Sequence, residues 1–231
     1  MTTLSPEDHK RISAAIARAE TATSGEIYCI LTRQVSEYRE TPFAWAAAAA
    51  LIIPAVLVPL GFSAAWFDWV PGFGGWTGGH AASAQATLTT TLFAYAITQA
   101  VVFFISALIV SAPPIRRALT PRSVKRARAH RTAMEQFLAK GLHLTSGRTG
   151  VLIFASLNDR VAEVIADEGI YAKVKPEVWE QAIQRLTDGL GRDAPAEGFV
   201  GAIELCGAVL AEHFPPGAVN PNEIRDGLVE I

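Results

Sequence analysis

Hydrophobic positions are unevenly distributed along the chain, and two uninterrupted apolar runs stand out. The first covers residues 43–62 and the second residues 92–112, and neither contains a charged side chain. At 1.5 Å per residue, about twenty helical residues cross a hydrocarbon layer of about 30 Å. The pattern therefore predicts two membrane-spanning helices joined by a loop at 63–91. Pro54 and Pro59 lie inside the first run and predict a kink, because membrane helices tolerate proline where neighbouring groups satisfy the freed carbonyl.

Shorter periodic patterns flank these runs. Ser5-Pro6 is typical of a helix start, because serine caps the first turn and proline is favoured at its first position. Strands are predicted where β-branched and apolar residues cluster, and helices where apolar residues recur every three or four positions. The predicted elements are a helix from Pro6, a strand at 26–32, a helix at 121–142, strands at 151–157 and 161–166, and helices from Pro176 and from Ala196 to His213.

The order of these elements predicts one discontinuous α/β domain. Residues 1–42 are too few to bury a core alone, so the strand at 26–32 is expected to pair with the strand at 151–157. We expect residues 1–42 and 116–215 to form a small mixed sheet covered by helices on both faces. A two-helix transmembrane hairpin at 43–115 would interrupt this domain, and residues 216–231 would form an extended tail.

Composition supports a membrane protein with a water-facing part. Hydrophobic residues make up 50% of the chain and charged residues only 18%, whereas soluble domains carry about 25% charge. Asp68 is the single charged residue between positions 43 and 115. Trp66, Trp69 and Trp76 lie in the predicted loop, and tryptophan is enriched at membrane interfaces. This distribution excludes a disordered chain and a single soluble globule.

The basic residues predict the orientation of the hairpin. Residues 113–150 carry nine Lys and Arg side chains and one acidic residue, Glu135. Lys and Arg close to membrane spans favour the cytoplasmic side, so both termini are expected in the cytoplasm and the tryptophan loop outside. A basic segment that directly follows an apolar run is better explained by the membrane than by nucleic acid, which we do not expect as a partner. Residues 1–20 contain no apolar core of a cleavable signal peptide.

Three segments of the chain resemble the TPM-domain family, whose name derives in part from a thylakoid-lumen phosphatase. They read SGEIYCILT before the hairpin, TGVLIFASLNDRVAEVIADEGI after it, and EGFVGAIELCGAVLAEHFP near the end. They combine an apolar strand, an Asp-Arg turn and a second strand ending near a glycine, followed by a helix that contains a tryptophan. The chain looks most like the bacterial branch in which two spans lie inside the domain, and the resemblance covers about residues 5–215. It implies a multi-pass protein of the bacterial inner membrane.

The resemblance also implies acid phosphatase activity and divalent-cation binding by carboxylates. The candidate ligands of Ca²⁺ or Mg²⁺ are Asp159, Glu163, Asp167 and Glu168, and Arg160 is the candidate phosphate contact. Members of the family commonly have an aspartate shortly before a Leu-Ser pair. Here only Met1-Thr2-Thr3 precedes Leu4-Ser5, so one expected cation ligand is missing. Polar residues at a turn and a strand end are also ordinary solvent-facing choices.

Three classes of function remain open. We favour a membrane-anchored binding or assembly module with weak divalent-cation binding, whose partners are the lipid bilayer and another membrane protein or a second copy. The alternative is a divalent-cation-dependent acid phosphatase, although no catalytic nucleophile or base is recognisable in the sequence. A transporter or channel would have to use the few polar residues in the spans, such as Thr98 and Gln99. Cys29 and Cys206 are expected to be small buried hydrophobes, because their spacing fits neither zinc nor redox motifs.

Overall fold

The structure is a computed structural model that describes residues 4–57, 59–60, 84–145, 147–217 and 221–231. Residues 63–83 of the predicted loop, including its three tryptophans, lie outside the described residues. The chain forms two compact units, one made of Met1–Glu37 with Pro121–Ile231 and the other of Tyr38–Thr120. Each unit is described by itself below.

The first unit combines helices with a four-stranded mixed sheet. Its elements are α1 (Pro6–Glu20), β1 (Glu26–Thr32), α6 (Arg122–Ala139), the 3₁₀ turn η2 (Leu142–Leu144), β2 (Gly150–Ser156), β3 (Val161–Ala166), α7 (Glu168–Tyr171), α8 (Pro176–Gly191), α9 (Pro195–His213) and β4 (Leu228–Glu230). The helix start predicted at Ser5 is confirmed, since its hydroxyl accepts from the Asp8 N–H at 3.1 Å and the Asp8 carboxylate accepts from the Ser5 N–H at 3.2 Å. This capping box satisfies two backbone donors that the first helical turn leaves unpaired.

The strand order in the sheet is β3-β2-β1-β4. The predicted pairing across the insertion is confirmed, because β1 and β2 are parallel with Ile27 opposite Val151 and Leu31 opposite Ala155. β2 and β3 form the expected antiparallel hairpin. The segment predicted as an extended tail ends in a fourth strand, since β4 pairs parallel with β1. This short strand was not predicted because three residues carry too little periodicity to distinguish a strand from an extended segment.

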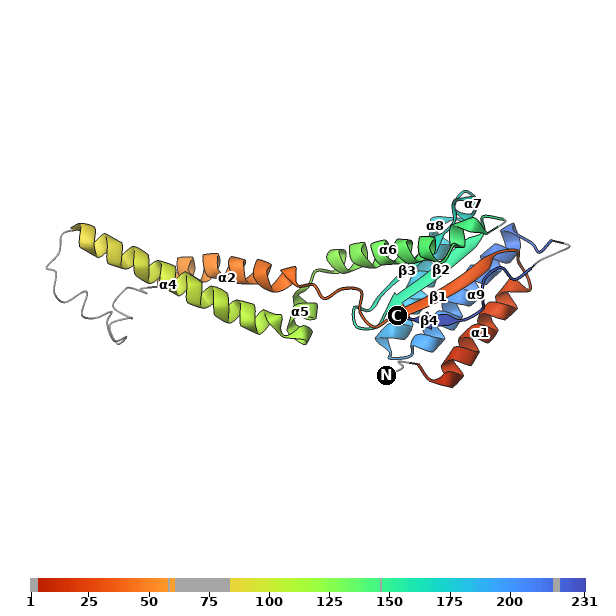
Figure 1. Ribbon diagram of the computed structural model, residues 1–231, viewed down its shortest axis with the longest axis horizontal. Helices are drawn as coiled ribbons and strands as arrows, with labels where there is room; N and C mark the ends of the chain where they lie inside the picture. The colour runs from red at the N-terminus through yellow and green to blue at the C-terminus, as the bar shows by residue number, and fades with distance from the viewer. Residues whose placement is uncertain (1–3, 58, 61–83, 146, 218–220) are drawn as a thin grey trace. The chain divides into compact units, whose positions relative to one another are not determined.

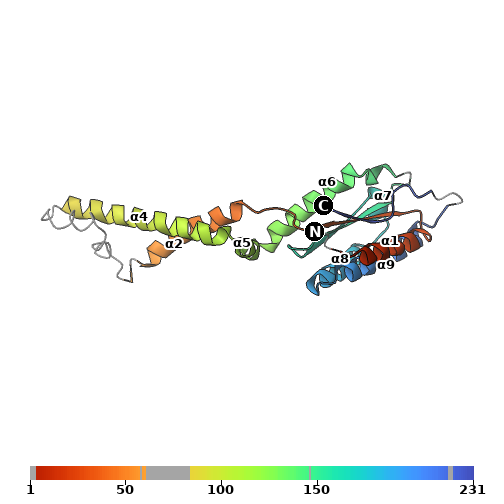
Figure 2. The ribbon, with the colours of Figure 1, turned by 60° about the horizontal axis from the view of Figure 1, so that its bottom comes forward.

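Helices cover both faces of the sheet, as predicted (Figures 1 and 2). α6 lies on one face, and α1, α8 and α9 lie together on the other. Alternate residues of each strand face the two sides, so Cys29 belongs to the core under α9, whereas Tyr28 belongs to the core under α6. Trp179 and Cys206 are buried in the α9 side, and both cysteines are free.

The buried face of α6 differs from the prediction. The apolar residues of the segment 121–142 predict a core-facing side that includes Met134, Phe137 and Leu138, but Met134 and Leu138 are 37% and 52% exposed. The buried residues are Ala129, Ala133 and Phe137, which recur every four positions. Two alanines in this row let the helix backbone approach the sheet closely, so steric fit rather than hydrophobicity selects the packed face.

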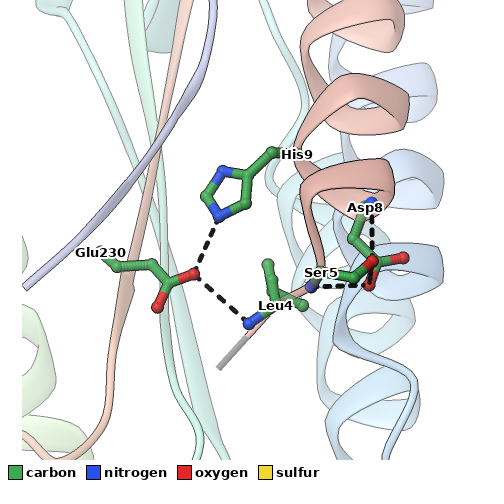
Figure 3. Close-up of polar contacts among 5 residues, drawn as sticks. All are labelled: Leu4, Ser5, Asp8, His9 and Glu230. Carbon is green, nitrogen blue, oxygen red and sulfur yellow. Dashed lines mark hydrogen bonds and ion pairs between the residues drawn. The ribbon is translucent and has the colours of Figure 1, made fainter. Parts of the chain in front are cut away.

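The two ends of the first unit are held together by one carboxylate (Figure 3). Glu230 lies in β4, and its Oε1 accepts from the Leu4 N–H at 3.4 Å and lies 2.9 Å from the His9 Nε2 in α1. The Ile231 N–H donates to the Leu31 carbonyl at 3.0 Å. The last residues of the chain are therefore fixed both to the sheet and to the first helix.

The second unit contains α2 (Glu40–Leu57), α4 (Ala84–Ser111) and α5 (Pro113–Leu119). α2 and α4 are both long and apolar enough to cross a membrane. α2 continues through Pro54 and ends before Pro59, so it is shorter than the predicted span at 43–62. α4 begins at Ala84, so residues 84–91, expected in the loop, are helical.

Candidate functional site

A groove with a volume of about 500 Å³ lies beside β3 in the first unit. Three elements line it: α6, the start of β3 and α8. The lining residues are Arg126, Arg160, Val161, Ala162, Glu163, Glu180, Ile183, Gln184, Thr187 and Asp188. β3 is an edge strand of the sheet, so the groove follows an edge that has a helix on each side. This is the best candidate for a binding site in the described part of the chain.

The backbone of β3 presents hydrogen-bonding groups toward its outer edge. The Asp167 N–H donates to the Gly150 carbonyl at 3.0 Å, which fixes the residues of β3 that bond to β2. In an antiparallel pair every second residue bonds inward. Glu163 and Ile165 therefore bond to β2, whereas the N–H and carbonyl groups of Ala162 and Val164 point outward.

The last outward position of β3 already has a partner. The Ala166 N–H bonds to the hydroxyl of Tyr171 in α7, and this hydrogen bond opposes the effect of burial, which raises the Tyr171 pKa. Tyr171 therefore covers the carboxyl end of the strand edge, and the groove occupies the opposite end.

Charged side chains of both signs line the groove. Arg126 and Arg160 are exposed, and so are Glu180 and Asp188 of α8. Glu163 is half-buried, and burial raises its pKa, while His130 at 3.4 Å and the charge of Arg126 act in the opposite direction. Glu163 thus has its own basic neighbours on α6, whereas the α8 wall keeps two carboxylates directed at solvent.

Asp159, one of the predicted cation ligands, fixes a turn through one of its carboxylate oxygens. Its Oδ2 accepts from the Val35 N–H at 2.9 Å and from the Ser156 hydroxyl at 3.0 Å. The side chain is only 6% exposed, and it fixes the β2–β3 turn to the segment after β1. The next residue, Arg160, has a φ of 50°, a left-handed conformation that ends the turn and leaves its side chain at the groove.

The four predicted cation ligands do not come together. Asp159 precedes β3 and Asp167 follows it, and a strand of this length separates its ends by about 20 Å. Asp167 caps α7 by accepting from the Glu168 N–H at 2.6 Å, and Glu168 itself is exposed. Within the described ranges no group of three or more His, Cys, Asp or Glu side chains could hold a metal ion. The predicted cluster is therefore corrected: closeness in sequence along an extended strand separates the carboxylates in space.

Two residues that the family resemblance implied as site residues line the groove, Arg160 as the predicted phosphate contact and Glu163 as a predicted cation ligand, but no residue of α8 was predicted. Glu180, Gln184 and Asp188 recur every four residues on the exposed side of an amphipathic helix, which is a visible pattern. The pattern alone did not single out these residues, because solvent-facing helix positions are normally polar. Their significance depends on β3 being an edge strand, and that follows only from the strand order.

A second group of carboxyl groups holds the chain terminus. Glu26 accepts from the Glu223 and Ile224 N–H groups, each at 3.3 Å, and burial raises its pKa. Burial raises the pKa of Glu20 to about 8, although the Ile27 N–H donates to its Oε1 at 2.8 Å. These contacts connect α1 and β1 to the segment that leads to β4, so we assign them to folding rather than to ligand binding.

The second unit has large apolar side chains on its outside. The residues buried between α2 and α4 are small or short, among them Ala46, Ala50, Ala94 and Thr98. The large exposed side chains on these helices are Phe43, Trp45, Leu51, Ile52, Ile53, Val56, Leu92, Phe93, Ile97, Val101, Phe104, Ile105, Leu108 and Ile109. This arrangement is the reverse of a water-soluble helix pair, which buries its large apolar residues.

The chain matches no family model, and no curated protein sequence matches it. Its fold is similar to the NMR structure of the BA42 protein from the psychrophilic bacterium Bizionia argentinensis, with a TM-score of 0.54. That similarity covers 98% of this chain and 94% of BA42 at 17% sequence identity. At this level of identity the similarity concerns the fold alone.

Proposed function

We propose that this protein is a membrane-anchored binding module of the TPM-like type. In this proposal α2 and α4 anchor the chain in a bilayer, and the groove beside β3 receives a partner, which is another membrane protein. The observation that carries the proposal is the reversed arrangement of the helix pair, with alanines inside and large apolar side chains outside. The resemblance of the sequence to the bacterial membrane branch of the TPM family supports the same assignment.

A bilayer would cover a large exposed apolar surface on the helix pair. Fourteen large apolar side chains of α2 and α4 are more than a third exposed, and covering each contributes about 1.5–3 kcal/mol. Because these side chains are on average about half exposed, leaving them in water would cost about 12–23 kcal/mol, as much as or more than the stability of a typical domain. Lipid removes this cost, and small residues such as Ala46 and Ala50 at a helix contact are typical of packing inside membranes.

The orientation follows from charge. Basic residues follow the second helix within one or two turns, for example Arg116 and Arg117 in α5. The positive-inside rule then puts both termini and the α/β unit in the cytoplasm of a bacterial cell, with the hairpin in the inner membrane. The groove would accordingly meet cytoplasmic segments of its partner.

A binding role is favoured over hydrolysis because of what the groove contains. It offers strand-edge backbone groups and side chains of both charges, which are features of peptide recognition. The carboxylates that the phosphatase hypothesis requires lie about 20 Å apart along β3. We therefore do not propose a cation-dependent phosphatase.

Membrane extraction of the full-length protein tests the anchor. We expect the protein to stay in the membrane pellet after alkaline carbonate treatment, and the double variant Leu51→Arg/Phe104→Arg to lose insertion, since each arginine costs about 2.5–3.5 kcal/mol at the centre of a span. Leu138→Arg is the matched control, because Leu138 is exposed on α6 in the other unit. Release of the unmodified protein by carbonate would refute the anchor. A reporter joined after Ile231 through a flexible linker should be cytoplasmic, and a periplasmic signal would refute the orientation.

A further inference from the structure

We propose that the groove binds an extended peptide segment that adds a strand to the outer edge of β3 and alternates basic with small apolar residues. The inference rests on the proposed function, because it takes this groove as the binding site and specifies what the site recognises. Three observations carry it: the outward backbone groups of β3, the helices on both sides of that edge, and the charges of the two walls.

The backbone of β3 supplies the hydrogen bonds. Ala162 and Val164 direct their N–H and carbonyl groups away from β2, and no other part of the described chain hydrogen-bonds to them. Both residues are only 5% exposed and only Ala162 lines the groove, so an added strand has to displace side chains of α6 and α8 to reach this edge. These two positions lie about 6.7 Å apart, the repeat of a β-strand. An added strand would therefore meet a ladder that is already in register, and main-chain hydrogen bonds would provide affinity independent of sequence.

The helices restrict what can reach this edge. Residues of α6 and α8 line the groove together with β3, so the edge is recessed between two helices. A sheet edge from a second copy of this unit would bring its own α6 and α8 against them. A single extended segment avoids this collision and lies about 4.8 Å from β3. The geometry therefore favours a peptide over edge-to-edge pairing of two copies.

The walls determine which side chains the peptide carries. Glu180 and Asp188 lie eight residues apart on α8, about 12 Å along the helix. Basic side chains at alternate positions of a strand recur every 6.7 Å, so two of them four residues apart match the two carboxylates. The opposite wall includes Val161 and Arg126, which favours a small apolar side chain there and disfavours a basic one.

Fluorescence anisotropy with a labelled nine-residue peptide of alternating lysine and valine tests the inference. The peptide is titrated into the full-length protein in non-ionic detergent, because anionic lipid would attract it unspecifically. We expect saturable binding, weakened at least tenfold in Glu180→Lys/Asp188→Lys. The matched control is Glu204→Lys/Glu212→Lys, which places the same charge change at the same eight-residue spacing on the exposed side of α9. It should change the affinity less than twofold.

Backbone methylation separates strand addition from charge attraction. Alternate residues of an added strand direct their N–H groups to β3, so N-methylation of either the valines or the lysines should weaken binding at least tenfold while methylation of the other set has little effect. Ala162→Pro removes one outward N–H and leaves the hydrogen bonds between β3 and β2 in place, and it should weaken binding of the unmethylated lysine–valine peptide. Should this variant fail to fold, the methylated peptides still decide the question.

Several results would overturn the inference. They are no binding of the lysine–valine peptide, equal binding of a glutamate–valine peptide, and equal effects of the two methylated sets. If the protein has the mass of a dimer in detergent and this dimer does not bind the peptide, the groove would be assigned to a second copy instead. None of these outcomes changes the carbonate extraction result, so failure of the peptide inference and failure of the membrane anchor are distinguishable.

Discussion

Replacement of Trp179 tests the packing of α8 against the sheet. Its side chain is 6% exposed in the core on the α9 side, and its ring lies 6.3 Å from that of Tyr171. A buried tryptophan removes about 150–250 Å² from water, worth about 4–6 kcal/mol at 25 cal/mol per Å². The Nε1 is buried without a hydrogen-bond partner, which subtracts about 1–3 kcal/mol. We therefore expect Trp179→Ala to lower the free energy of unfolding by about 3–4 kcal/mol, within the range for large core truncations.

Trp179→Phe should cost much less, about 1 kcal/mol, because it removes the unpaired donor together with part of the apolar area. Hydrogen exchange of the β2 amides, measured by mass spectrometry on the detergent-solubilised protein, reports on this unit alone when exchange requires its unfolding. The alanine variant should exchange there two to three orders of magnitude faster.

The control is Trp45→Ala, because Trp45 belongs to the other unit, where its Nε1 donates to the Leu119 carbonyl. It should leave exchange in β2 unchanged. An alanine variant at position 179 that exchanges within tenfold of the parent would refute the packing argument. A phenylalanine variant as unstable as the alanine variant would refute the argument about Nε1.

Three further predictions follow from buried polar groups and close contacts. Because burial raises the pKa of Glu20 to about 8, the folded state keeps a proton that the unfolded chain releases above about pH 4.5, so the melting temperature of the protein should fall between pH 5 and 8. The Glu20→Gln variant should show a smaller fall and melt at a higher temperature than the parent at pH 8. An unchanged dependence of the melting temperature on pH would contradict the assignment. Asp159→Ala should destabilise the first unit by about 2–4 kcal/mol in denaturant unfolding, since two buried donors lose their acceptor. The parent protein should show no Mg²⁺- or Ca²⁺-dependent phosphomonoesterase activity. If it shows such activity and Asp159→Asn abolishes it, the enzyme hypothesis is restored. Gly207→Ala should cost about 1–3 kcal/mol because its new Cβ would lie 2.6 Å from the Ala19 Cβ, while Gly201→Ala on the same helix has 3.9 Å to its nearest neighbour and should be neutral or stabilising in the same thermal melts.

Local signals in the sequence predicted most of the sheet. β1 and β2 each contain a continuous apolar run of five residues, and all seven residues of each strand are buried; such runs are typical of strands covered on both faces. Two features depended on information that the sequence does not hold locally. β4 becomes a strand through its pairing with β1, and the packed side of α6 is decided by how closely two alanines let the helix approach the sheet.

The candidate site was predicted only in part for the same reason. Arg160 and Glu163 were singled out through the resemblance to the TPM family, as a phosphate contact and a cation ligand, and both line the groove. Proximity in sequence wrongly grouped Asp159 with Asp167, since an extended chain moves successive residues apart by about 3.3 Å. The contribution of α8 required the strand order, which sets β3 at the edge and depends on contacts between residues far apart in sequence.

The closure of the sheet by the chain's last residues has a consequence for biosynthesis. β1 emerges early from the ribosome, yet its neighbours are made only at residues 150–156 and 228–230. Until residues 228–230 are made, one edge of this apolar strand lacks its partner and can pair with other chains. A product that ends before Leu228 would keep that edge open. The exposed edge of β1 would thus distinguish chains that lack β4 from chains that have it, and chaperones and proteases that recognise unpaired apolar strands would act on the chains without β4.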